Sequence, residues 1–94
     1  MDTIFDFLKT YAEQYEVIDT RNFTASEIAK VKDAEIVAST YGTSVCFFMH
    51  GGGQKYIPTS RDSVVSVGDK VDLHTAKILT LEREGERINR VEIV

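Results

Sequence analysis

The feature that most constrains this chain is a side-chain period of two that begins at Ala34 and continues to the C-terminus. Residues 34–39 read AEIVAS, so that Ala34 and Ile36 alternate with Glu35 and Val37. This period is typical of a β-strand, whose successive side chains point to opposite faces of a sheet. Turn-forming residues separate further strand-like segments at 44–50, 54–59, 70–82 and 87–94. We therefore predict about five antiparallel strands over residues 34–94, the first three in a meander, with 70–82 either one long strand or a bent pair.

Two helices are predicted before the strands. Residues 3–15 carry an apolar stripe with i, i+3, i+4 spacing, which is typical of an amphipathic helix; its members are Ile4, Phe7, Leu8, Tyr11, Ala12 and Tyr15. A helix of this length is marginal alone, so the stripe is expected to dock on another part of the structure. Thr24 and Glu27 have the spacing of a capping box, which predicts a short second helix over 25–32.

The length and composition predict one globular domain. The chain has 94 residues, of which 43% are apolar and 28% charged, with one proline. These values are typical of a folded domain with a modest core. We expect a single α+β domain over residues 1–94, in which the β region, 34–94, forms either an open five-stranded antiparallel sheet or a small barrel.

The charge and the cysteine content narrow the classes of partner and the cellular location. A net charge of −4 argues against a protein that binds duplex DNA through a broad basic face, although a local basic groove is compatible with it. A single cysteine, Cys46, excludes an internal disulfide and is expected to be a reduced, buried thiol. We find no apolar stretch near the ~20 residues of a membrane span and no signal-peptide pattern, so we expect a cytoplasmic protein with no membrane partner.

The residues do not form a recognisable catalytic or metal-binding pattern. Cys46, His50 and His74 are the only cysteine and histidine residues, and they lack metal-ligand spacing. On one strand, Cys46 and His50 would be roughly 13 Å apart, too far for a nucleophile and its base. The glycines at 51–53 precede a strand-like segment, whereas a phosphate loop leads into a helix. We therefore predict a non-enzymatic protein with no cofactor and no metal.

The segment SVCFFMHGGGQKYIP, residues 44–58, is predicted to form a β-hairpin with the three glycines as its loop. That register places Phe48 opposite Tyr56 and Met49 opposite Lys55. Alternation then gives the hairpin two apolar faces. One face, which we expect to be plain core, carries Val45, Phe47, Met49 and Ile57, and the other carries Cys46, Phe48, His50, Tyr56 and Pro58.

The face with Phe48 and Tyr56 has two interpretations. The helix over 3–15 covers it in the first, and in the second the two rings are exposed and stack against nucleic-acid bases. Cations near the hairpin or around the last turn could hold a phosphate backbone: Lys55, Arg61, Arg83, Arg87 and Arg90. Partial coverage by the helix satisfies both interpretations.

The order of strands and turns over 34–94, including the segment VGDKVDL, resembles a small OB-fold domain of the single-stranded-DNA-binding type. The resemblance implies an OB-like barrel that binds single-stranded nucleic acid through Phe48 and Tyr56 on the hairpin and through Arg83 and Arg87 in the final loop. Lys55 and Arg61, which lie beside the hairpin in the sequence, complete the predicted nucleic-acid-binding residues. The chain departs from the family in lacking a helix at 60–69 and in carrying two N-terminal helices. The alternative is a protein-interaction or assembly domain, with a protein partner or a second subunit and no role in nucleic-acid binding.

Overall fold

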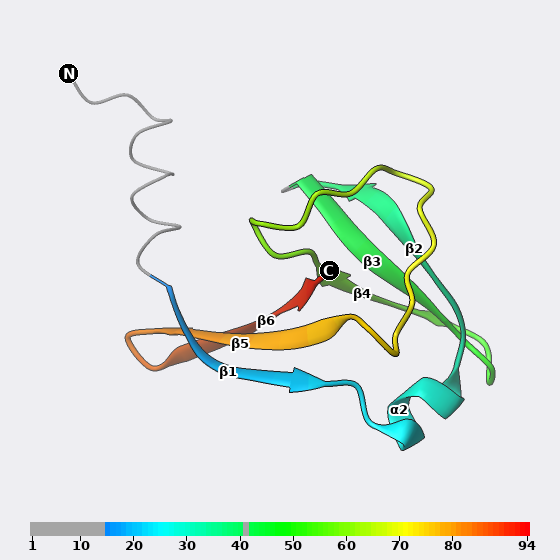
Figure 1. Ribbon diagram of the computed structural model, residues 1–94, viewed down its shortest axis with the longest axis horizontal. Coiled ribbons are helices and arrows are strands. Elements are labelled where there is room, and N and C mark those ends of the chain that lie inside the picture. The colour runs from blue at the N-terminus through cyan, green and yellow to red at the C-terminus, as the bar shows by residue number, and fades with distance from the viewer. Residues whose placement is uncertain (1–14, 41) are drawn as a thin grey trace.

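The computed structural model describes residues 15–40 and 42–94, and this part of the chain is mostly β. Within these described residues, six antiparallel strands form two three-stranded sheets, joined by one short helix (Figure 1). Sheet A has the strand order β1-β5-β6, and sheet B the order β2-β3-β4. The elements are β1 (Glu16–Asn22), α2 (Ala25–Lys30), β2 (Val31–Ser39), β3 (Gly42–Met49), β4 (Gln54–Pro58), β5 (Lys77–Arg83) and β6 (Glu86–Glu92).

The predicted short helix is confirmed, together with its capping box. The Thr24 hydroxyl accepts the backbone N–H of Glu27 at 3.1 Å, and the Glu27 carboxylate accepts the backbone N–H of Thr24 at 2.9 Å. Helix α2 ends at Lys30, two residues before the predicted end, because Val31 is extended and begins β2. The helix predicted over 3–15 lies outside the described residues, apart from Tyr15.

Strand β1 was not predicted from the sequence. It pairs with β5, and a bulge at Ile18 separates the paired residues Val17 and Asp19. The bulge puts an extra residue in the strand and breaks the period of two. All seven residues of β1 are exposed, so the strand also lacks the apolar face that identifies the other strands.

The hairpin of β3 and β4 forms, but the predicted register is wrong by two residues. Phe48 pairs with Gln54, and Tyr56 pairs with Cys46. The loop is centred on Gly51, one residue earlier than predicted, because Met49 donates its N–H to the Gly53 carbonyl and Gly52 donates to the Met49 carbonyl. Gly52 and Gly53 have φ of +90° and +83°, a conformation that glycine adopts without strain. Since the shift is an even number of residues, the side chains keep the faces that alternation assigned to them.

The C-terminal hairpin is shorter than predicted at its start. The predicted strand over 70–82 corresponds to β5, and the residues before β5 turn at Asp72, whose backbone carbonyl accepts the N–H of Ala76 at 3.0 Å. Glu84 and Gly85, with φ of +51° and +82°, connect β5 to β6 in a two-residue turn. Positive φ at both central residues matches the right-handed twist of the paired strands.

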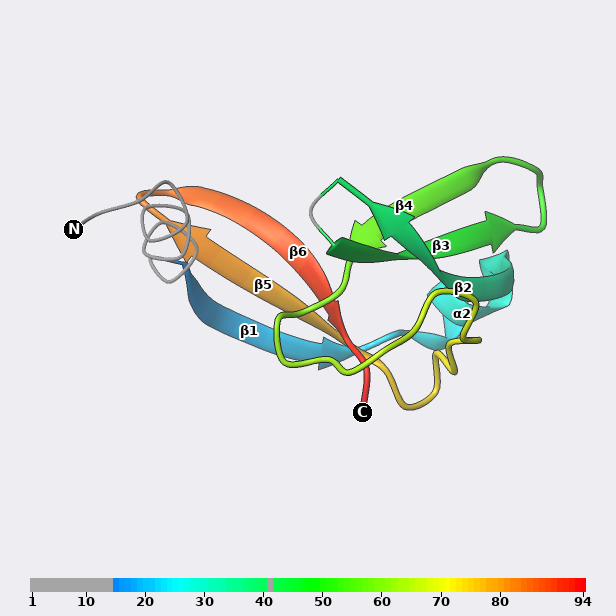
Figure 2. The same ribbon diagram turned by 90° about the horizontal axis from the view of Figure 1, so that it is seen from above.

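The two sheets meet where β4 ends, and they do not close into a barrel over the described residues. Thr59 forms a parallel bridge with Val91 of β6, and the Ser60 N–H donates to the Val91 carbonyl at 2.8 Å. Figure 2 shows the sheets extending in opposite directions from this junction. Ile36, Val45 and Val91 are fully buried beside it and form the centre of the core.

We predict that Thr24→Ala lowers the free energy of unfolding by about 1 kcal/mol, because the alanine leaves one N–H at the start of α2 without its acceptor. Thr24→Ser keeps a hydroxyl at the same place and is the matched control. Urea unfolding followed by circular dichroism measures both variants. Equal midpoints for the alanine and serine variants would show that this cap does not stabilise the domain.

Candidate functional site: an open groove between the two sheets

The two aromatic residues predicted to bind nucleic acid lie on the outer face of sheet B, away from the core. Tyr56 is 59% exposed, and its hydroxyl donates to the Gln54 side chain at 2.6 Å. Phe48 is half-buried, and Cys46, opposite Tyr56, is buried as predicted. The neighbouring Cys46 thiol raises the pKa of the Tyr56 hydroxyl. The outer face therefore offers one well-exposed ring in place of two opposed rings.

The four predicted cations do not gather around these rings. Lys55 precedes Tyr56 and lies on the opposite face of β4, and Arg61 lies in the loop that follows β4. Arg83 and Arg87 flank the turn between β5 and β6, at the far end of the molecule from the loop between β3 and β4 (Figures 1 and 2). Arg87 forms an ion pair with Glu82 at 3.0 Å, and the Arg83 guanidinium lies 5.1 Å from the Tyr15 ring centre. The two aromatic residues and the four cations predicted to bind nucleic acid therefore lie on several different surfaces.

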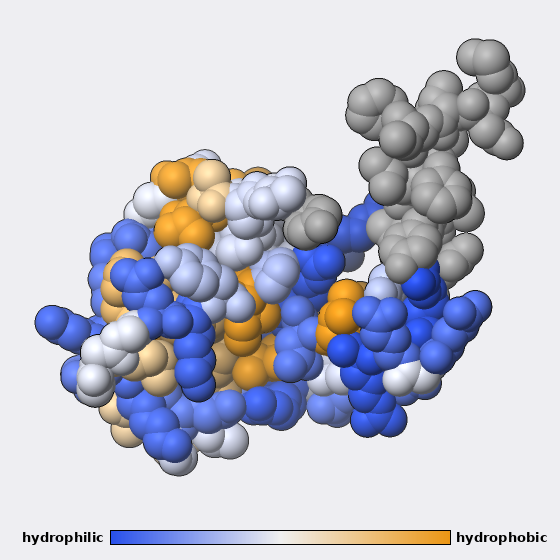
Figure 3. Space-filling view, turned by 180° about the vertical axis from the view of Figure 1, so that it is seen from behind, coloured by the Kyte–Doolittle hydropathy of each residue, from blue (hydrophilic) through white to orange (hydrophobic). Residues whose placement is uncertain are grey.

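A different part of the surface is hollowed. Where the sheets diverge next to α2, they leave an open cavity of about 560 Å³, which we call the inter-sheet groove. Its lining residues come from both sheets and from α2: Phe23, Glu27, Lys30, Val31, Phe47, Met49, Lys55, Tyr56, Ile57 and Ile78. The space-filling view shows hydrophobic side chains at the surface of sheet B where it borders sheet A (Figure 3). A volume of this size is within the range of ligand-binding pockets.

The floor of the inter-sheet groove is apolar because alternation turns one face of β3 and β4 inward. Phe47 and Ile57 belong to this face, and Ile78 contributes from β5 across the gap. Phe23, between β1 and α2, packs its ring on Phe47 with 5.9 Å between the ring centres. Phe47 is buried, whereas Phe23, Met49 and Ile57 are only partly covered. The inner face of sheet B, predicted to be plain core, is therefore open at this end.

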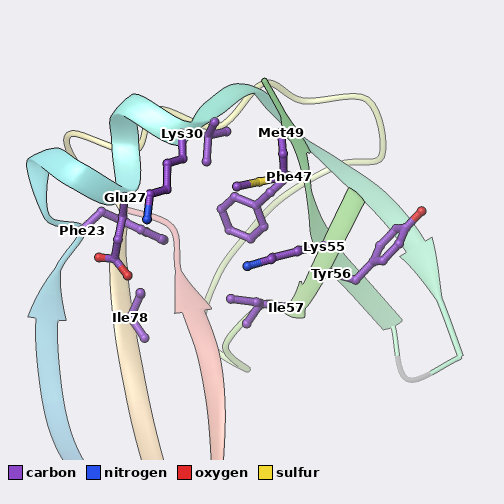
Figure 4. A pocket seen from close by; sticks show the side chains of 10 residues that line it. Phe23, Glu27, Lys30, Phe47, Met49, Lys55, Tyr56, Ile57 and Ile78 are labelled. Carbon is purple, nitrogen blue, oxygen red and sulfur yellow. The ribbon is translucent and has the colours of Figure 1, made fainter. Parts of the chain in front are cut away.

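Two lysines reach over this apolar floor. Lys55 is paired with Phe47 and so projects from the inner face of β4, and Lys30 is the last residue of α2. The Lys30 carbonyl accepts the His50 N–H at 3.0 Å, which fixes the end of α2 against the hairpin loop. Figure 4 shows both lysine side chains directed into the inter-sheet groove, while Tyr56 points away from it.

The electrostatic balance of the inter-sheet groove is positive. Glu27 also lines it, but its carboxylate forms a two-point ion pair with Arg21, with distances of 2.8 and 3.1 Å. This pairing, assisted by the Thr24 N–H, lowers the pKa of Glu27 from 4.5 to about 2. Within residues 15–40 and 42–94, Lys30 and Lys55 form no ion pair. A chain of net charge −4 thus presents, above an apolar surface, two lysines that have no ion-pair partner in the described part of the chain.

Sequence reasoning missed the inter-sheet groove, although one residue carried a signal for it. Alternation places Lys55 on the same face as Ile57, which was assigned to the core. A lysine is almost never fully buried without a partner, so its presence on an inner face indicates that this end of the face reaches solvent. Phe23 and Ile78 carried no such signal, because their places in the lining of the inter-sheet groove depend on the packing of the two sheets.

No protein-family model, curated protein or solved structure matches this chain. The described residues contain no cluster of three or more His, Cys, Asp or Glu side chains that could hold a metal ion. Nor does the described part of the chain contain a helix long and apolar enough to cross a membrane.

We predict that the Arg21–Glu27 pair makes stability depend on pH in the acid range. Because the pKa of Glu27 is lower in the folded state, the pair stabilises the fold above pH 4.5, and this stabilisation is lost as the pH falls toward 2. Glu27→Gln keeps an acceptor for the Thr24 N–H but carries no charge. The variant is therefore expected to be less stable than the wild type near neutral pH and to lose less stability on acidification.

Urea unfolding at several pH values between 7 and about 2.5 measures this difference. Glu86→Gln, at an exposed position with no ion pair in the described part of the chain, is the matched control. The assignment is contradicted if Glu27→Gln and the wild type lose stability in parallel over this range.

Proposed function

We propose that this chain is a non-enzymatic protein-interaction domain whose inter-sheet groove binds an acidic, apolar peptide segment. One observation carries the proposal: Lys30 and Lys55, without ion-pair partners in the described structure, stand over a floor of partly covered apolar side chains. A segment with apolar residues on one side and carboxylates near the rim would complement both features.

The apolar floor supplies the affinity in this proposal. Full burial of one leucine or phenylalanine side chain contributes about 1.5–3 kcal/mol, so two or three anchors give a useful gross free energy. Part of it is offset by the ordering of the peptide. The lysines add specificity, because an acidic segment is attracted to the rim whereas a basic segment is repelled.

The inter-sheet groove suits a peptide better than a nucleic acid. Stacking requires the exposed face of an aromatic ring, and Phe47, at the centre of the floor, is only 4% exposed. Two lysines can neutralise few phosphates, and the chain as a whole repels a polyanion. A peptide needs only apolar anchors and a few acidic side chains.

The test uses a fluorescently labelled peptide of about twelve residues, composed of Leu, Phe, Asp and Glu. The protein is titrated into the peptide, and fluorescence anisotropy measures binding. The matched peptide has lysine at every acidic position. We expect the acidic peptide alone to bind, and Lys30→Glu/Lys55→Glu to weaken binding about tenfold, since each rim ion pair contributes up to about 1 kcal/mol.

The control is Lys32→Glu/Arg61→Glu, which changes the net charge equally at exposed positions that do not line the inter-sheet groove. An equal loss in both double variants would assign the effect to overall charge and contradict the proposal. Failure of the acidic peptide to bind at about 200 µM protein would also remove it.

A second candidate function is single-stranded nucleic-acid binding on the outer face of sheet B, the role that the OB-fold resemblance implies. The 59% exposure of Tyr56 favours it, because a base could stack on that ring. We expect Tyr56→Ala to weaken oligo-dT binding by about 1–3 kcal/mol and Tyr56→Phe to preserve it. Fluorescence titration at low and moderate salt measures both. No binding of oligo-dT at ~50 µM protein and low salt would exclude this function.

A further inference from the structure

The N-terminal sequence of this chain has the chemistry that the inter-sheet groove is proposed to bind. Residues 1–14 read MDTIFDFLKTYAEQ, with three acidic side chains against one lysine. Their helical pattern groups Ile4, Phe7, Leu8 and Tyr11 on one stripe, which needs an apolar surface to cover it. The floor of the inter-sheet groove is such a surface, and its two lysines, which form no ion pair within the described residues, have the complementary charge.

The position of β1 argues that the segment reaches a different molecule. Strand β1 begins at Glu16. Five residues farther along, Arg21 pairs with Ile78, which lines the inter-sheet groove, so Arg21 marks the position of the groove along β1. These five residue steps correspond to about 17 Å of strand. In a helix that ends at Tyr15, Tyr11, Phe7 and Ile4 lie about 6, 12 and 16 Å from that point. Such a helix would bring only Ile4 level with the inter-sheet groove of its own chain and would leave the rest of the stripe short of it.

We infer that the inter-sheet groove takes the N-terminal segment, residues 3–15, of a second copy of this chain. This inference rests on the proposed function and names its partner. If each copy inserts its segment into the groove of the other, the result is a closed symmetric dimer with two identical contacts. With the apolar stripe on the floor, the acidic residues face outward and act on the lysines over the ~8–10 Å range of screened charges.

The first experiment measures the mass of the full chain by sedimentation over about 1–200 µM. We expect the wild type to dimerise and Phe7→Asp/Leu8→Asp to remain monomeric at every concentration. Thr3→Asp/Thr10→Asp adds the same charge outside the stripe and is expected to dimerise. Lys30→Glu/Lys55→Glu, which weakens both contacts, should raise the dimer dissociation constant about 100-fold. A wild type that stays monomeric throughout overturns the inference.

The second experiment separates this inference from the proposed function. A labelled peptide of residues 1–15 is titrated onto Phe7→Asp/Leu8→Asp, whose inter-sheet groove is intact, beside the generic acidic peptide. Binding of both peptides, each weakened about tenfold by Lys30→Glu/Lys55→Glu, supports the inference. Binding of the generic peptide alone leaves the proposed function standing and overturns this partner. If neither peptide binds, both the inference and the proposed function fail. If the wild type is monomeric and binds the 1–15 peptide more weakly than Phe7→Asp/Leu8→Asp does, the segment occupies the inter-sheet groove of its own chain, and the inference is overturned.

Discussion

The backbone bridge between Thr59 and Val91 is the constraint on which the arrangement of the two sheets depends. The chain leaves sheet B at the end of β4, and the Ser60 N–H binds the Val91 carbonyl of sheet A at 2.8 Å. Val91 has no exposed surface, so the junction is also the most deeply buried point of β6. A hydrogen bond in such surroundings is costly to break, because water cannot reach the separated groups. The sheets are therefore held firmly at one place and are free to diverge beyond it.

This divergence explains why one inner face is closed at one end and open at the other. Ile36 and Val45, near the junction, are completely buried. Along β2, an edge strand of sheet B, the loop before β5 supplies backbone partners. The Ile36 N–H donates to the Asp69 carbonyl, and the Val71 N–H donates to the Ala34 carbonyl. Toward α2 the cover is thinner, since Phe23 and a six-residue helix with no buried residue lie over the end of the sheet. The inter-sheet groove is the space that this short helix does not fill.

The sequence predicted most of the face assignments, and it failed where the fold depends on contacts between distant segments. Alternation assigned Phe47 and Ile57 to the inner face and Tyr56 to the outer face, and an even register error left those assignments intact. The register depended on which residues close the loop, and the hydrogen bonds of Met49 decided that. Strand β1 has neither an apolar face nor an unbroken period, and only its pairing with β5 makes it a strand. The inter-sheet groove was beyond local reasoning because Ile78 and Phe47 line it together only when both sheets are in place.

The lysines of the inter-sheet groove protect the open face of sheet B against aggregation. An exposed apolar surface beside unpaired strand edges promotes aggregation, and a charged residue that points inward is one of the devices by which natural sheets prevent it. Lys55 is such a residue on β4, and Pro58 lacks the N–H that would extend pairing along that strand. Repulsion among the lysines of neighbouring molecules disfavours random stacking of this face. In the proposed function the same charges attract carboxylates, so that the lysines which prevent indiscriminate association would also select an acidic partner.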